Sequence, residues 1–392
     1  MKILYVITGL TCGGAEHLMM QLADQMLLRG HDVNIICLSG ISEIQPTQKH
    51  NIHYIRMEKN VRGFVKALFQ VRKIITVIKP DIIHSHMFHA NIFSRIIRIL
   101  TPSVPLICTA HNKNEGGYAR MLCYRLSDFL ASITTNVSQE AVQEFIAKKA
   151  APKNKIIEVP NFVNTTNFSF DLKARKERRN FFGIKDNTLL LLAVGRLVDA
   201  KDYPNLLNAI NYLTLSESTG FDNFILFIAG DGVLKSKLVD LVNKLNLADK
   251  VFFLGRRSDI KELMCAADLF VLSSQWEGFG LVVAEAMACE RLVVATDSGG
   301  VREVVGPHND VIPVSNHILL AEKIAGVLKM DEKTKNMIAL KNRQHIVSHF
   351  SIQNIVSNWE CLYYKYSRCT DKLVEKFCLH FECVTSFYIV IF

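Results

Sequence analysis

The stretch LFVLSSQWEGFGLVVAEAMACERLVVAT, residues 269–296, decides the fold. It starts with an apolar, β-prone run at 269–272. A short loop with two glycines follows, and an apolar segment of helical length then leads into a second β-prone run at 292–295. A strand, a helix and a second strand in this order form a βαβ unit, and strands that are apolar throughout are typical of a parallel sheet covered on both faces. The stretch therefore predicts a parallel α/β domain.

The same alternation continues on both sides of this stretch. In the first half we expect strands at 2–8, 32–38, 82–85, 106–109 and 131–136, and helices near 14–29, 61–79, 90–100, 118–129 and 138–149. In the second half we expect strands at 189–194, 223–229, 251–254, 269–272 and 292–295, and helices near 203–215, 233–246, 259–266, 280–289 and 316–329. The pattern breaks between the halves, where 160–164 resembles a turn and the charged run KARKERR at 173–179 resembles a solvated loop.

Two such series predict two doubly wound, Rossmann-like α/β domains that face a central cleft. We expect an N-terminal domain at 1–170, a C-terminal domain at 180–350 and an aromatic-rich helix at 351–370. The last segment, 371–392, ends in an apolar run without a regular period, and we assign no role to it.

Composition agrees with a globular protein of this kind. A chain of 392 residues has room for two domains, and 49% hydrophobic residues exclude a disordered or collagen-like chain. The formal charge of +9 favours an anionic partner: a nucleotide, a nucleic acid or an acidic lipid.

The cysteines and the N-terminus indicate the compartment. None of the ten cysteines forms a CxxC pair and several lie inside apolar runs, which is typical of reduced core residues. The first residues, MKILYVITGL, lead directly into a glycine-rich loop, so we interpret them as a strand and not as a secretory signal. No run of eighteen apolar residues occurs. We expect a cytoplasmic protein, with peripheral contact to the inner face of the plasma membrane.

The EGFG loop predicts an anion site. Gly278 and Gly280 allow the backbone to approach a ligand closely, and the helix that opens near Leu281 offers free amides with partial positive charge. Glu277 stands before these amides, and Glu285 lies five residues past Gly280, about 7–8 Å along the helix. Two carboxylates that flank an anion site suit a nucleotide-sugar, because one can accept sugar hydroxyls and the other ribose hydroxyls.

A second element, VGRLVDAKDYPNLL at 194–207, supplies positive charge. Gly195 turns the chain after a strand, and Arg196 and Lys201 leave from the carboxyl end of that strand. Two cations at this place can clamp a diphosphate and stabilise its charge as it departs.

Together these residues resemble the retaining glycosyltransferases of family 4, which have the GT-B fold. The resemblance covers about residues 1–368 and includes GGAE at 13–16, HSH at 84–86, TAH at 109–111, PNFVN at 160–164, LGRRSDI at 254–260 and SGGVREVV at 298–305. It implies that the catalytic residues are Glu277, Lys201, Arg196 and His111. It further implies that the helix at 351–370 returns to the N-terminal domain. It implies donor-binding roles for Glu285, Gly278, Phe279, Gly280, Leu281, Gly13, Gly14 and Arg256.

The resemblance also implies an activity. We expect a hexose to move from a nucleoside-diphosphate sugar, with uracil as the favoured base, to a saccharide or lipid-linked saccharide bound by the first domain. The resemblance implies that configuration is retained, in polysaccharide or lipopolysaccharide biosynthesis. Of the two routes to retention, we favour a front-face route over a double displacement, because the motifs of the first domain offer no obvious second carboxylate. Two alternatives stay open: a nucleotide-sugar epimerase on the same fold, which needs no acceptor, and a non-catalytic nucleotide-binding protein. A dehydrogenase is disfavoured because the GxGxxG fingerprint is absent.

Metal and membrane partners are judged from residue types. No Asp-x-Asp occurs in the sequence. The histidines at 84, 86 and 89 have no nearby carboxylate in the sequence that would complete a set of metal ligands. We therefore expect metal-independent chemistry, with the nucleotide-sugar as co-substrate. Segment 59–79 has basic residues, no acidic residue and helical apolar spacing, which predicts contact with an anionic membrane surface. We expect no nucleic acid partner.

Overall fold

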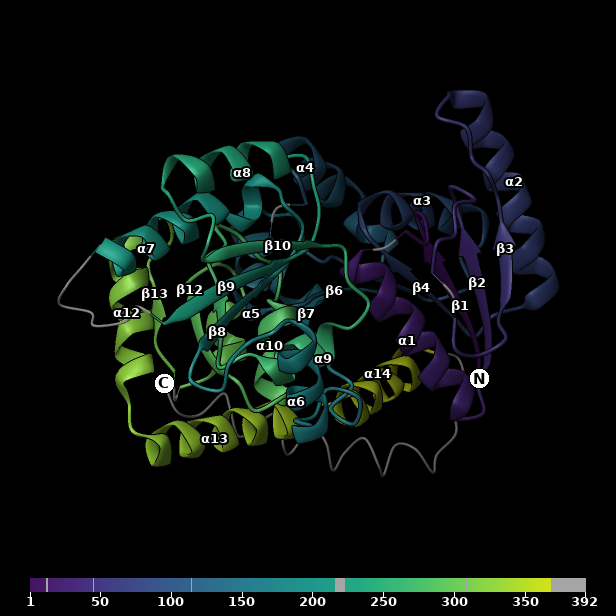
Figure 1. Ribbon diagram of the computed structural model, residues 1–392. Helices are drawn as coiled ribbons and strands as arrows, with labels where there is room; N and C mark the ends of the chain where they lie inside the picture. Colours follow the sequence, from purple (N-terminus) through teal and green to yellow (C-terminus); the bar gives the residue numbers. More distant parts are fainter. Residues whose placement is uncertain (12, 45, 114, 216–222, 308, 368–392) are drawn as a thin grey trace. The chain divides into compact units, whose positions relative to one another are not determined.

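The structure is a computed structural model that describes residues 1–11, 13–44, 46–113, 115–215, 223–307 and 309–367 (Figure 1). The chain divides into two compact units. Unit 1 contains Met1–Asn161 and the chain from Gln353 onward, and unit 2 contains Phe162–Ile352. The predicted tail at 371–392 lies outside the described residues. No helix in the described ranges is long and apolar enough to cross a membrane.

Unit 1 is built on a parallel sheet with the strand order β3-β2-β1-β4-β5-β6-β7. The order reverses between β1 and β4, and ligands of such sheets bind beyond the carboxyl ends of the strands at this switch point. The strands are β1 (Lys2–Ile7), β2 (Asp32–Cys37), β3 (Asn51–Tyr54), β4 (Ile82–His86), β5 (Leu106–Thr109), β6 (Ile133–Asn136) and β7 (Ile156–Glu158). The helices are α1 (Gly14–Leu28), α2 (Val61–Ile78), α3 (Phe88–Leu100), α4 (Tyr118–Ser127), η1 (Asp128–Leu130), α5 (Gln139–Ala147), η2 (Lys153–Lys155) and α14 (Ile352–Tyr366).

Unit 2 repeats the plan with the strand order β10-β9-β8-β11-β12-β13, and its switch point lies between β8 and β11. The strands are β8 (Leu189–Val194), β9 (Phe224–Ala229), β10 (Val251–Gly255), β11 (Leu269–Leu272), β12 (Leu292–Thr296) and β13 (Val311–Ile312). The helices are α6 (Leu172–Phe181), η3 (Asp199–Lys201), α7 (Tyr203–Leu215), α8 (Lys235–Lys244), α9 (Ile260–Ala266), α10 (Leu281–Ala288), α11 (Val301–Val305), α12 (His317–Lys329) and α13 (Glu332–Phe350). The core lies between the sheet and its flanking helices.

The predicted class of two doubly wound parallel sheets is confirmed, and the longer predicted strands and helices are all present. Every β8–β13 neighbour pair runs parallel, as the apolar strands require. The sequence analysis missed β3, β7 and β13, which have two to four residues each, and it missed α11 and α13.

The prediction of a loop at 173–179 is wrong, because these residues form α6. Asp171 caps the helix, and its side chain accepts hydrogen bonds from the amides of Lys173 and Ala174. Arg175 and Arg179 lie one turn apart on the same face and both bind the carboxylate of Asp268, at 2.5 and 3.2 Å. The charged run is therefore an anchor of unit 2 and not a solvated linker.

Candidate functional site

The loop between β11 and α10 holds Glu277 in a constrained backbone. Gly280 adopts the left-handed conformation with φ of 90° and begins α10. Gly299, with φ of 63°, packs so closely that a Cβ atom there would lie 2.0 Å from the Glu277 carbonyl oxygen. The N-cap residue of α10, Gly280, makes no side-chain hydrogen bond to the first amides, and the anion site at this helix start stays a prediction.

Lys201 and Glu277 meet at the switch point of unit 2. Lys201 Nζ lies 2.5 Å from Glu277 Oε1, and both side chains are largely shielded from solvent. Ser274 Oγ donates to the same carboxylate oxygen at 2.7 Å. The two residues lie 76 positions apart in the chain, and they meet because β8 and β11 are neighbours in the sheet.

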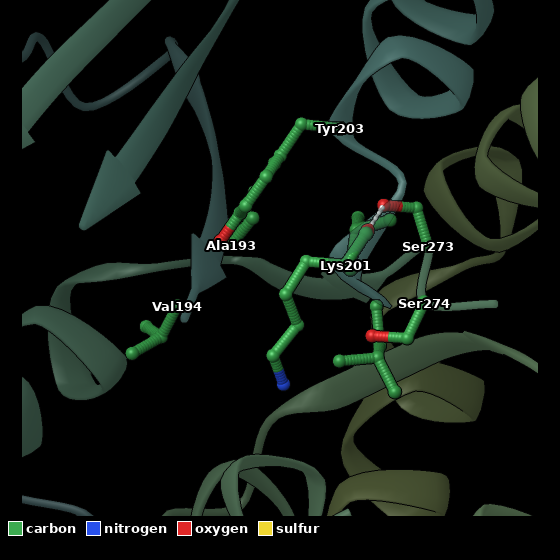
Figure 2. Close-up of a pocket in the computed structure, with 8 residues that line it drawn as sticks. Ala193, Val194, Lys201, Tyr203, Ser273 and Ser274 are labelled. Atoms are coloured by element: carbon green, nitrogen blue, oxygen red, sulfur yellow. Dashed lines mark hydrogen bonds between the residues drawn. The ribbon is translucent and has the colours of Figure 1, made fainter. Parts of the chain in front are cut away.

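A small pocket opens beside this ion pair. It is lined by Ala193, Val194, Lys201, Tyr203, Val271, Leu272, Ser273 and Ser274. Figure 2 shows these residues, with the hydrogen bond of 2.9 Å that Ser273 Oγ donates to the Lys201 carbonyl. Tyr203 donates to the Gly195 carbonyl at 3.1 Å, which fixes the turn after β8. Ser273, Ser274 and Tyr203 were missed by the sequence analysis, although the serines directly follow a predicted strand.

Glu285 is the chemically unusual member of the site. It lies on α10 and is partly buried among apolar neighbours, and no hydrogen bond or ion pair reaches its carboxylate from the described residues. Burial raises the pKa of Glu285 to about 8 because the charged form loses its hydration. A carboxylate in this state is stabilised by a ligand that donates hydrogen bonds to it.

The two arginines among the candidates are solvent-exposed. Arg196 follows β8 and Arg256 follows β10. Within the described part of the chain neither guanidinium has a side-chain partner. Both are therefore available to bind an anion near the carboxyl edge of the sheet. The structure shows no contact that joins either arginine to the Lys201–Glu277 pair.

The remaining candidates of the EGFG loop differ in whether the side chain or the backbone is free to contact a donor. Phe279 is buried and packs edge-on against Phe350, with the ring centroids 5.3 Å apart. Its side chain therefore anchors the loop, and only its amide is left for a donor. Gly278 and Leu281 contribute backbone at the same junction.

Gly13, Gly14 and His111 belong to unit 1. Gly13 precedes α1, and a Cβ atom there would lie 2.3 Å from Glu16 Oε2, so a larger residue would make the Glu16 side chain shift. A Cβ atom on Gly14 would meet nothing within 4 Å. The two glycines therefore have different roles, and Gly14 is the one beside open space.

His111 follows β5 and joins a buried polar cluster. Its Nε2 lies 3.2 Å from His86 Nδ1, and Glu115 accepts hydrogen bonds from the amides of His111 and Asn112. Burial lowers the pKa of His111 to about 4, so the ring is neutral at physiological pH. Glu115, which the sequence analysis missed, is thus the residue that shapes the loop carrying His111.

His84 extends this cluster toward the C-terminal helix. Its Nδ1 lies 2.7 Å from the Tyr363 hydroxyl of α14, and its Nε2 lies 2.6 Å from Thr109 Oγ1. Both ring nitrogens are thus occupied. Among the described residues, no group of three or more His, Cys, Asp or Glu side chains is arranged to hold a metal ion.

Comparisons with known proteins address the family and the fold. Residues 12–167 match the family model "Glycosyltransferase Family 4", and residues 174–344 match "Glycosyl transferases group 1". The N-acetyl-alpha-D-glucosaminyl L-malate synthase of Bacillus anthracis is 25% identical, over 91% of this chain and 96% of that protein. The UDP-Gal:alpha-D-GlcNAc-diphosphoundecaprenol alpha-1,3-galactosyltransferase of Escherichia coli is 25% identical, over 92% of this chain and 96% of that protein.

The fold is shared with solved structures. The crystal structure of HepE from Anabaena in complex with UDP superposes with a TM-score of 0.81, at 20% identity, over 92% of this chain and 98% of HepE. Two parallel Rossmann-like sheets with these neighbours are the GT-B fold. The family models together span both units. The chain therefore belongs to the GT-B glycosyltransferases of family 4.

Proposed function

We propose that this glycosyltransferase moves a hexose from a UDP-sugar to a lipid-linked saccharide, with retention of configuration. The family assignment supports the reaction class, and retention is the behaviour expected of family 4. The names of the relatives support the substrates, because the Escherichia coli relative is named for a UDP-sugar donor and a diphosphoundecaprenol acceptor. In this proposal unit 2 holds the donor and unit 1 receives the acceptor.

The observation that carries the proposal is the state of Glu285. Its carboxylate is partly buried, has no partner among the described residues and has a pKa raised to about 8. The two ribose hydroxyls of a nucleotide are donors of the kind such a carboxylate lacks. The Lys201–Glu277 pair lies at the other end of the same junction, where it can hold the sugar and the diphosphate.

Each candidate then has a role. Lys201, Arg196 and Arg256 bind the diphosphate together with the first amides of α10, and Glu277 orients the sugar hydroxyls. In the front-face route the bond from C1 to the diphosphate oxygen breaks. The acceptor oxygen bonds to C1 on the same face, and its proton passes to the departing phosphate. His111 is neutral in the free protein and belongs to unit 1, to which this proposal assigns the acceptor.

Two buried carboxylates of unit 1, Glu16 and Glu115, support this route over a covalent intermediate. A double displacement needs a free carboxylate behind the sugar. Glu16 accepts a hydrogen bond from Thr11 at 2.8 Å and packs against Gly13. Glu115 accepts two backbone amides and has its pKa raised by burial. Both groups are engaged in shaping loops and are poorly suited to act as nucleophiles.

The positive charge supplied by Lys201, Arg196 and Arg256 also supports metal-independent transfer, because a diphosphate that leaves beside these cations has its charge balanced by the protein. The test is transfer in excess EDTA. Unchanged turnover is expected, and a loss that Mg²⁺ or Mn²⁺ restores would contradict this part of the proposal.

The assay for the function has two stages. Thermal unfolding is measured with UDP, GDP and ADP, and the account expects the largest stabilisation with UDP. UDP-sugars are then incubated with N-acetylglucosaminyl diphospho-undecaprenol, and the linkage of the product is determined by NMR. An α-linked product from an α-linked donor supports the proposal. Isomerised donor without acceptor would identify an epimerase, and nucleotide binding without any product would identify a non-catalytic protein.

We further propose that α2 brings the enzyme to the inner face of the plasma membrane from the cytoplasm. Val61, Val65 and Phe69 recur every four residues and are 80%, 43% and 60% exposed. Basic side chains flank this stripe, and the opposite face of α2 packs on the sheet. The flanking residues are Arg62, Lys66, Arg72 and Lys73. This combination suits an interface helix on anionic lipid.

The membrane proposal is tested by co-sedimentation with phosphatidylglycerol vesicles. Phe69→Glu is expected to weaken binding strongly, and binding of the wild type is expected to fall as salt rises. Leu126→Glu on α4, at a position 68% exposed in the same unit, is the matched control. Equal binding to neutral and anionic vesicles, or a larger loss in the control, would refute the role of α2.

A further inference from the structure

The loop that carries Glu277 is fixed at several points. The amide of Gln275 donates to the Ala200 carbonyl at 2.9 Å, and its side chain reaches Asp202 and Ser315 at 3.3 and 3.1 Å. On the other side of Glu277, Phe279 is buried in the core. The chain between these anchors therefore has a defined position.

Trp276 lies between these anchors, and its indole is exposed to solvent. The side chain is 49% exposed, whereas the other tryptophan of the chain, Trp359, is 4% exposed. Trp276 has no hydrogen bond or ring contact with any described residue. Tryptophan is a large apolar residue that folding normally buries, so its display on a fixed loop beside the donor site points to a ligand.

Trp276 lies outside the pocket beside Lys201. The pocket beside Lys201 is lined by eight residues, and Trp276 is not one of them. Ser274 and Glu277, its near neighbours in the loop, direct their polar groups to Lys201. The indole is thus left for a group outside the pocket, on the residue that directly precedes Glu277 in the loop.

We propose that Trp276 is a binding platform for the acceptor saccharide. A pyranose has a face made of C–H groups that stacks on an aromatic ring, and the indole N–H can donate to a hydroxyl at its edge. A saccharide held on Trp276 would lie at the loop that also carries Glu277. This inference rests on the proposed function, and it adds one residue of unit 2 to the acceptor binding that the proposed function assigns to unit 1.

The test uses tryptophan fluorescence, because Trp276 is the exposed one of two tryptophans. The protein is saturated with UDP and titrated with the methyl glycosides of glucose, galactose, N-acetylglucosamine and N-acetylgalactosamine. At least one glycoside is expected to change the emission of the wild type. Trp276→Ala is expected to bind that glycoside at least about tenfold more weakly by saturation-transfer NMR, and Trp276→Tyr is expected to restore binding to within about threefold.

Three results would overturn the inference. These are an emission change that persists in Trp276→Ala, unchanged glycoside binding in that variant, or no response to any glycoside while UDP binds. The thermal shift with UDP is recorded in the same samples. A protein that UDP does not stabilise refutes the proposed function itself, whereas a protein that UDP stabilises without a Trp276 response refutes only the platform.

Discussion

Replacement of Glu285 by glutamine is expected to stabilise the free enzyme and to weaken donor binding. Burial raises the pKa of Glu285 from its ordinary value of 4.5 to about 8. A carboxyl group with a raised pKa contributes stability that is complete below pH 4.5 and is lost as the pH rises through 8. At about 1.4 kcal/mol per pKa unit, the whole pKa shift corresponds to about 5 kcal/mol in the free energy of unfolding. About 3 kcal/mol of this stabilisation is lost between pH 5.5 and pH 8.

Glu285→Gln keeps the shape of the side chain and removes the ionisation. The free energy of unfolding of the wild type is therefore expected to fall relative to the variant by about 3 kcal/mol between pH 5.5 and pH 8. Scanning calorimetry of both proteins across this range measures the difference as several degrees in the unfolding temperature of unit 2. Parallel pH profiles would show that Glu285 is already ionised in the free protein, and they would refute the reasoning.

The same variant tests the role of Glu285 in binding. If the charged carboxylate accepts the ribose hydroxyls, UDP-glucose affinity of the wild type is expected to rise about tenfold per pH unit below pH 8. The esterified diphosphate of UDP-glucose keeps a constant charge over this range. Calorimetric titration of Glu285→Gln is expected to show weak binding without this pH dependence, and an identical slope in both proteins would place the ionisation elsewhere.

Three further predictions concern single residues of the two units. Lys201→Met is expected to lower turnover by about 10²–10³-fold because it removes a cation from the diphosphate, whereas Lys244→Met on the exposed face of α8 leaves turnover unchanged. Gly299→Ala is expected to lower both the unfolding temperature and the thermal shift with UDP, because its Cβ would lie 2.0 Å from the Glu277 carbonyl oxygen. Gly326→Ala in α12 is the control, and it is expected to leave the unfolding temperature unchanged or to raise it, because a Cβ there meets nothing within 4 Å. His111, whose pKa is about 4, is expected to keep the NMR shifts of a neutral imidazole from pH 8 down to about pH 5, and titration within that range would contradict its burial beside His86.

The fold was predictable where strands are apolar throughout. The runs at 269–272 and 292–295 became β11 and β12 because a strand covered on both faces needs apolar residues at every position. β3, with the sequence NIHY, has no such run, because this edge strand is only partly buried. α6 was not predicted because its charged residues resemble those of a solvated loop. The ion-pair partner of Arg175 and Arg179 is Asp268, which lies far away in the sequence.

The candidate site was predictable in its residue types but not in its pairing. The sequence placed Lys201 and Glu277 after separate strands, and only the order of the sheet shows that β8 and β11 are neighbours. Ser274 and Glu115 were missed because their contacts are formed by the folded loops. The exposure of Trp276 and the lack of a partner for Glu285 are properties of packing that residue spacing does not encode.

The most direct test of the central claim is a crystal structure of the enzyme with a bound UDP-sugar. The account predicts that the ribose hydroxyls lie on the Glu285 carboxylate and that the diphosphate lies beside Lys201 and the first amides of α10. A nucleotide bound at another place, with the Lys201–Glu277 pair undisturbed and the Glu285 carboxylate without a partner, would contradict it.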